Sequence, residues 1–165
     1  MTEPDRIELL QNIPIFGGMK RETLSFLLDA SNRAKFEQGQ FLFHQDDPAD
    51  EFYVLESGRV AILKRWEDQE FLLRRLETGD CLGEMALIDY CPRSASAAAE
   101  TDCVLLRIAS KTMLDLYEKD LEQFALIQMN LARELSRRLR HAGELLFESR
   151  TRAEVSENQV HYSPI

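Results

Sequence analysis

The chain has 165 residues, of which 44% are hydrophobic and 30% charged, and its formal net charge at pH 7 is −9. This length suits one domain whose core needs no disulfides or metals, and the acidic balance argues against direct nucleic-acid binding, which normally uses a basic surface. No apolar run is long enough for a membrane span, and residues 1–5 lack the basic start of a signal peptide, so we expect a cytoplasmic protein.

The first two thirds of the chain change from helical to strand-like patterning. Apolar residues recur with helical spacing over 5–11 and 20–30, so residues 1–36 are predicted to form a helical lead. Over residues 37–109, short apolar runs alternate with turn sequences rich in Asp, Gly and Pro. This pattern predicts an antiparallel β-barrel or jelly roll, and therefore an α+β fold.

The last third is predicted to be helical, with a short helix over residues 110–118 and a long one over 120–150. Apolar residues of the long helix recur at heptad-like spacing, interrupted by Gln128 and Arg138. Such a stripe favours pairing with a second helix, although an amphipathic helix folded over its own domain would show a similar pattern. Residues 151–165 are polar and are predicted to be a disordered tail.

The segment over residues 82–97 has the residue types of a phosphate-ester site. A short helix predicted to begin at Glu84 would present backbone N–H groups, which favour an anion. Arg93 would supply a planar cation that matches phosphate oxygens, whereas the Glu84 carboxylate only accepts hydrogen bonds and so suits a ribose hydroxyl. Gly83 allows a close approach of the backbone, and Ser94 adds a small donor beside the arginine. Small side chains leave room for a ligand against the backbone: Ala86, Ala95 and Ala97. Together these features predict a nucleotide site.

This segment resembles the phosphate-binding cassette of the cyclic nucleotide-binding domain family, which includes bacterial catabolite activator-type proteins and the regulatory subunits of protein kinase A. The cassette pattern is Gly-Glu, an apolar pair, a short loop, and Arg followed by a small residue and Ala. It is matched by Gly83, Glu84, Ala86, Leu87, Arg93, Ser94 and Ala95. The resemblance extends over roughly residues 7–148, so residues 1–150 are expected to form one such domain, with the β-barrel at 37–109 and C-terminal helices at 110–150.

The resemblance implies a regulatory sensor, not an enzyme, that binds cyclic AMP or cyclic GMP. Arg93 is then expected on the cyclic phosphate and Glu84 on the ribose. Ile62 and Leu73 are our candidates for apolar walls around the purine, and counting from Arg93 places Arg138 and Leu139 where relatives cover the base. The complete predicted ligand-binding set is Gly83, Glu84, Met85, Ala86, Arg93, Ser94, Ala95, Ile62, Leu73, Arg138 and Leu139, with no catalytic residue.

Cysteine and histidine usage bears on cofactors. Cys81, Cys91 and Cys103 lack Cys-x-x-Cys spacing, so we expect neither disulfides nor a metal site and interpret all three as small core residues. We expect no cofactor, although a haem or gas sensor using His44 or a cysteine is conceivable. A carboxylate enzyme site is disfavoured, because Glu84, Asp80 and Asp89 are not accompanied by a nucleophile–base pair.

Partners are implied by the resemblance as well. The long helix is the dimerisation helix of activator-type relatives, so a homodimer through residues 120–148 is expected. Occupancy would pass through the C-terminal helices to an unknown downstream protein. Residues 151–165 are too few for a DNA-binding domain, so a stand-alone sensor is expected. The alternatives are a ligand-free dimeric scaffold, or the sensor part of a transcription regulator or larger signalling protein.

Overall fold

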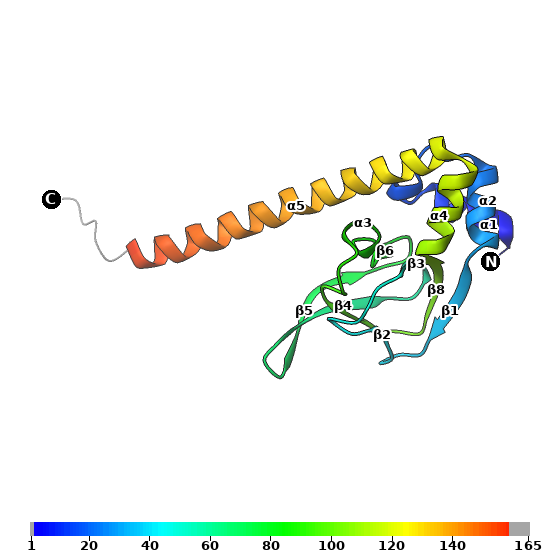
Figure 1. The fold of residues 1–165 in the computed structure, drawn as a ribbon. Helices are drawn as coiled ribbons and strands as arrows, with labels where there is room; N and C mark the ends of the chain where they lie inside the picture. The colour runs from blue at the N-terminus through cyan, green and yellow to red at the C-terminus, as the bar shows by residue number, and fades with distance from the viewer. Residues whose placement is uncertain (1, 159–165) are drawn as a thin grey trace.

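The computed structural model describes residues 2–158, which begin with two short helices separated by a 3-10 turn (Figure 1). These are α1 (Glu3–Gln11), η1 (Pro14–Phe16) and α2 (Arg21–Asp29). A reciprocal capping box starts α1, because the Thr2 hydroxyl accepts from the backbone N–H of Asp5 while the Asp5 carboxylate accepts from that of Thr2. The two helices predicted in this region are confirmed.

Within residues 2–158, eight strands form two antiparallel sheets of four strands each. The first has the order β1 (Asn32–Phe36), β8 (Cys103–Ala109), β3 (Glu51–Ser57), β6 (Cys81–Leu82). The second has the order β2 (Phe41–Phe43), β7 (Ser96–Ala99), β4 (Val60–Trp66), β5 (Gln69–Leu76). The predicted antiparallel jelly-roll architecture is confirmed, as two packed sheets with free edges.

Strand β1 falls inside the segment that the sequence assigned to the helical lead. It is a short edge strand that pairs with β8 along its whole length, from Asn32 opposite Arg107 to Phe36 opposite Cys103. None of its side chains is fully buried. A polar edge strand of this kind has no clear apolar alternation, so its pattern gave no strand signal.

The core has two layers that share strand β3. Phe52 and Val54 face the helices, whereas Leu55 faces the second sheet, as the two-residue period of a strand requires. The helical layer contains fully buried Phe16, Leu24, Leu27, Ile108 and Ile127. The layer between the sheets contains Val60, Leu76, Ala97 and Leu105. Burial on both faces explains why β3 reads as a continuous apolar run.

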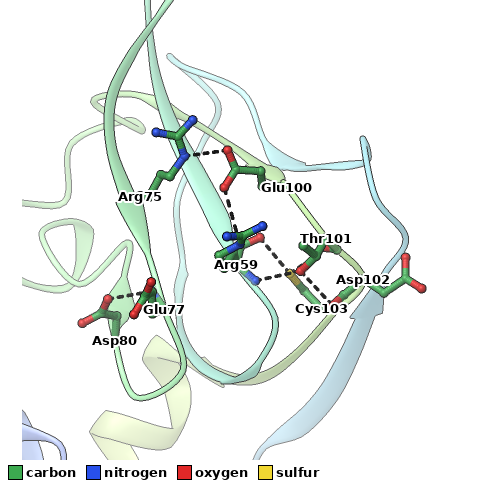
Figure 2. A network of polar contacts seen from close by, with 8 residues as sticks. All are labelled: Arg59, Arg75, Glu77, Asp80, Glu100, Thr101, Asp102 and Cys103. Carbon is green, nitrogen blue, oxygen red and sulfur yellow. Dashed lines mark hydrogen bonds and ion pairs between the residues drawn. The ribbon is translucent and has the colours of Figure 1, made fainter.

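Polar contacts hold several of the turns that connect the strands (Figure 2). The Glu100 carboxylate lies 2.6 Å from Nε of Arg75 on β5 and 3.8 Å from Nε of Arg59 in the β3–β4 turn. The buried thiol of Cys103 lies 3.1 Å from the carbonyl oxygens of both Arg59 and Thr101. Cys103 therefore has the structural role that the sequence predicted for it.

Two helices end the described chain, α4 (Ser110–Lys119) and α5 (Leu121–Asn158). The first half of α5 packs on its own domain, with Ile127 and Leu131 fully buried, and the Asn130 amide donates 2.9 Å to the carbonyl of Gly17. Its C-terminal end projects away from the sheets, toward the left of Figure 1. No helix within residues 2–158 is both long and apolar enough to cross a membrane.

The predicted disordered tail is wrong for residues 151–158, because α5 continues through them. These residues are polar but contain no Gly or Pro, and polarity by itself does not end a helix. An ion pair of 3.7 Å between Glu148 and Arg152 adds an i,i+4 contact across the predicted boundary. Residues 159–165, the rest of that tail, lie outside the described part of the chain.

Candidate functional site

The predicted cassette is a turn, a single helical turn and a loop. Gly83 has φ +79°, and the turn at Glu84 is closed by a hydrogen bond of 3.1 Å from the Leu87 N–H to the Glu84 carbonyl. The helix itself, α3 (Ala86–Asp89), begins two residues later than predicted. Tyr90 adopts a left-handed conformation at its end, with φ +54°. A loop that contains Arg93 then leads into β7.

A pocket of about 680 Å³ lies between this cassette, strands β4 and β5, and helix α5. Most of the predicted set lines it: Gly83, Glu84, Met85, Arg93, Ser94, Ala95, Ile62, Leu73 and Arg138. Leu139 is 75% exposed and is not among the lining residues, so its predicted place in the site is not supported. Ala86 is the first residue of α3. The structure thus gathers the predicted residues from three separate parts of the chain.

Arg93 is a buried cation at one end of the pocket. It is 5% exposed, its guanidinium carbon lies 4.2 Å from the centre of the Phe43 ring, and Nη1 lies 3.4 Å from the Gly83 carbonyl. Its buried Nε has no hydrogen-bond partner, and Arg93 forms no ion pair within residues 2–158. Burial lowers the pKa of Arg93, while nearby Tyr53 and Glu51 act in the opposite direction. Such a group is stabilised by an anion entering the pocket.

Glu84 is a buried carboxylate that is held by the long helix. It is 2% exposed, and its Oε1 pairs with Nη1 of Arg138, whose Nε lies 3.0 Å from Oε1 of Glu134. The second carboxylate oxygen, Oε2, is not part of this ion pair. That oxygen can therefore accept from a ligand hydroxyl while Arg138 compensates the charge.

Several residues of the pocket were missed by the sequence reasoning: Phe43, Lys64, Arg74, Cys91 and His141. Lys64 is two residues from Ile62 on β4, so strand alternation alone would have found it. Its Nζ donates to the Ser94 carbonyl at 2.5 Å. Arg74 pairs with Ile62 across a bulge between Ile62 and Leu63, which no sequence pattern revealed.

The close contact between Gly83 and Arg93 gives a mutational test. A Cβ on Gly83 would lie 2.4 Å from Arg93 Nη1, whereas one on Gly79, which also has a positive φ, would meet nothing within 4 Å. Both alanine variants should lose about 1–2 kcal/mol of unfolding free energy through backbone strain. Only Gly83→Ala also displaces the guanidinium, so we expect it to weaken anion-dependent ligand binding by roughly tenfold or more.

Chemical denaturation and calorimetric titration of the two variants measure these effects separately. Gly79→Ala serves as the matched control for strain, and we expect it to bind as the wild type does. Equal affinities for Gly83→Ala and Gly79→Ala would mean that the position of the Arg93 guanidinium does not matter to binding.

Comparison with known proteins identifies the class. Residues 33–120, more than half of the chain, match the cyclic nucleotide-binding domain family. The cyclic AMP receptor protein of Thermus thermophilus is 34% identical over 134 residues, which are 81% of this chain and 60% of that protein. The crystal structure of the Thermus thermophilus catabolite activator protein is similar with a TM-score of 0.72 and 36% identity, over 82% of this chain and 63% of that one. This chain belongs to the cyclic nucleotide-binding domain family.

Two further similar proteins differ in how much of their own length this chain covers. A cyclic nucleotide-binding domain from Methylobacillus flagellatus has a TM-score of 0.78 at 20% identity, over 88% of this chain and 83% of that one, a likeness of fold. An NTE family protein of Mycobacterium tuberculosis is 32% identical over 133 residues, which are 81% of this chain and 22% of that protein. The chain thus spans between about a fifth and three fifths of the length of these curated relatives.

Proposed function

We propose that the pocket binds a cyclic mononucleotide and that the chain acts as a regulatory module. The observation that carries this proposal is the state of Arg93. This residue is 5% exposed, and its guanidinium Nε has no hydrogen-bond partner among the described residues. A cyclic phosphate would supply the missing acceptor and the compensating charge. Glu84 lines the same pocket, and its Oε2, which is not part of the ion pair with Arg138, suits the ribose hydroxyl.

Cyclic AMP is our first candidate for the ligand. It is supported by the similarity to a Thermus thermophilus protein named a cyclic AMP receptor protein. The base would lie between the apolar side chains of Ile62 and Leu73 and the α5 residues that line the pocket, Arg138 and Ala142 among them. These walls are apolar enough to hold either purine.

Cyclic GMP is a second candidate because of Arg74. This side chain lines the pocket but makes no hydrogen bond or ion pair with any residue between 2 and 158. Burial and the neighbouring Arg138 lower the pKa of Arg74. An arginine can donate two hydrogen bonds to O6 and N7 of guanine but not to the amino-bearing edge of adenine. Arg74 thus favours guanine in the choice between the two purines.

A thermal-shift titration compares the two ligands and tests the function at once. We expect the unfolding temperature to rise with the concentration of cyclic AMP or cyclic GMP, because a ligand that binds only the folded state stabilises it. A ligand-free dimeric scaffold would show no change in unfolding temperature with either nucleotide. A larger rise with one nucleotide than with the other at equal concentration would show whether the pocket prefers adenine or guanine.

We further propose that α5 forms a dimer seam with the α5 of a second copy. Leu135, Leu139, Ala142 and Leu146 follow one another at intervals of four, three and four residues, which is the spacing of a coiled-coil face. Leu139 is 75% and Leu146 56% exposed in the single chain. The inner part of the apolar stripe, including Leu131, is already buried within its own domain. Sedimentation equilibrium would find twice the 19.1 kDa of one chain.

Arg138 is the proposed link between the pocket and α5. It joins the buried Glu84 to the long helix and lines the pocket itself. We propose that occupancy orders the turn over residues 84–87 and that Arg138 transmits this ordering to the C-terminal helices and an unknown partner. A ligand acts in this way only if it distinguishes two states of the coupled elements.

Hydrogen exchange tests this transmission. We expect cyclic AMP to slow amide exchange in α3 and in α5 near residue 138, and we expect Arg138→Ala to keep the change in α3 but to lose most of that in α5. Arg137→Ala is the matched control, because Arg137 is 63% exposed and forms an ion pair with its own-helix neighbour Glu134. Exchange in α5 that is identical with and without nucleotide in the wild type would overturn the transmission proposal.

A further inference from the structure

Cys91 stands apart from the other two cysteines. Cys81 and Cys103 are buried core residues, as the sequence predicted, but Cys91 is exposed and the prediction for it is wrong. It lies in the loop between α3 and Arg93, and its side chain is among those that line the nucleotide pocket. The backbone N–H of Cys91 donates 3.0 Å to the Asp89 carboxylate, and Sγ lies 3.6 Å from the Asp89 carbonyl.

The surroundings of this thiol are built to receive an anion. Arg93, two residues further along the chain, is 95% buried and lines the same pocket; its Nη1 lies 3.4 Å from the Gly83 carbonyl, but its Nε finds no acceptor in the described part of the chain. Lys64 lines the pocket as well, and Asp89 is the neighbouring carboxylate. A small anionic reagent drawn to Arg93 would therefore enter the pocket whose wall carries the Cys91 thiol.

We propose that Cys91 is a thiol-modification site, specific for small anionic disulfides, whose modification and nucleotide binding exclude each other. This inference rests on the proposed nucleotide function of the pocket. Exclusion follows from position, because Cys91 lines the pocket two residues from Arg93, so that an adduct on it would take up part of the volume that the nucleotide needs.

The chemistry is thiol–disulfide exchange. The Cys91 thiolate attacks one sulfur of the disulfide, a bond forms between the two sulfurs, the original S–S bond breaks, and the departing thiolate takes up the proton that Cys91 released. No further oxidant is needed, since the disulfide supplies the oxidising equivalent. An added dithiol reverses the reaction and restores the free thiol.

The other cysteines serve as internal controls. Burial raises the pKa of the Cys81 thiol well above its ordinary value, and the nearby Glu84 acts in the same direction, so Cys81 holds little of the reactive thiolate. Cys103 is buried, with Sγ 3.1 Å from two backbone carbonyl oxygens. In the folded protein only one of the three thiols should therefore react rapidly.

The experiment uses the full chain and 5,5′-dithiobis(2-nitrobenzoate), an anionic disulfide that releases a coloured thiolate. We expect one fast-reacting thiol, lost in Cys91→Ser, with a rate that falls about tenfold or more at saturating cyclic AMP. We also expect the modified wild type to lose calorimetric cyclic AMP binding and to regain it after reduction, whereas treatment should leave the affinity of Cys91→Ser at the value measured for that variant before treatment.

Failure of the Cys91 inference can be distinguished from failure of the proposed nucleotide function. A protein that binds cyclic AMP by calorimetry, but whose Cys91 reacts at the same rate with and without it, would overturn this inference and leave the proposed function standing. A wild type that binds neither cyclic AMP nor cyclic GMP before any treatment would overturn the proposed function, and with it the exclusion argued for Cys91.

Discussion

Replacing Arg93 with alanine is expected to weaken cyclic nucleotide binding by roughly 30-fold to several thousand-fold, because truncating one member of a buried charge pair costs about 2–5 kcal/mol. The guanidinium is nearly fully buried and forms no ion pair within residues 2–158, although the nearby Glu51 carboxylate opposes the lowering of its pKa by burial. A bound phosphate would be its first direct ionic partner.

The same substitution should cost little in folding. Burial lowers the pKa of Arg93, which means that its charge is poorly solvated in the ligand-free protein. Removing a poorly solvated cation does not leave another buried charge unpaired. Loss of binding with a nearly unchanged unfolding temperature would thus separate a binding role for Arg93 from a structural one.

Calorimetry with cyclic AMP measures the loss, and two variants control it. Arg93→Lys keeps the charge but not the planar fork, so we expect intermediate affinity. Arg152→Ala removes an arginine that is 84% exposed near the far end of α5, and its affinity should equal that of the wild type. An Arg93→Ala protein within a few-fold of wild-type affinity would refute the assignment of Arg93 to the phosphate.

Replacing Glu84 with alanine should weaken cyclic AMP binding by about 10- to 150-fold, corresponding to about 1.5–3 kcal/mol for a hydrogen bond to a charged group. The carboxylate is buried, and its ion pair with Arg138 uses Oε1 and not Oε2. The expected donor is a ribose hydroxyl. In Glu84→Ala, Arg138 also loses its ion pair with Glu84 and retains its ion pair with Glu134.

A double-mutant cycle with 2′-deoxy cyclic AMP isolates the ribose contact. The deoxy ligand should bind the wild type more weakly than cyclic AMP does, and this difference should vanish in Glu84→Ala. Asp89→Asn is the matched control, because Asp89 is an exposed carboxylate of the same pocket. If the wild type bound the deoxy ligand as tightly as cyclic AMP, Glu84 would not contact the ribose.

The parts of the site that depend on local chemistry were predictable from the sequence. Gly83, Glu84 and Arg93 lie within eleven residues of one another, and their chemical types already distinguish a phosphate from a hydroxyl partner. The structure places all three in one pocket. Their role in binding stays a prediction until a ligand is measured.

Contacts between distant elements were not predictable in the same way. Arg138 was placed at the level of the base by counting along the chain, but the structure pairs it with Glu84, 54 residues away, because α5 passes over the cassette. Arg74 enters the pocket through a strand bulge. Neither the path of a helix across a sheet nor the position of a bulge leaves a periodic signal in the sequence.

The long helix shows a further limit of periodicity. Apolar residues recur along all of α5, yet Ile127 and Leu131 are buried in their own domain while Leu139 and Leu146 are exposed. An apolar stripe indicates that one face of a helix is buried, but it does not show whether that face packs on its own domain or on another chain. Only the exposed second half is available to a second copy of the chain.

The central claim is that the pocket is a working cyclic nucleotide site, and isothermal titration calorimetry of the unmodified protein tests it most directly. Cyclic AMP and cyclic GMP are titrated separately, with adenosine 5′-monophosphate as the control that lacks the cyclic phosphate. We expect saturable binding of at least one cyclic nucleotide with one site per chain, and much weaker binding of the control. Absence of saturable binding for both cyclic nucleotides, in a protein that unfolds cooperatively, would contradict the proposed function.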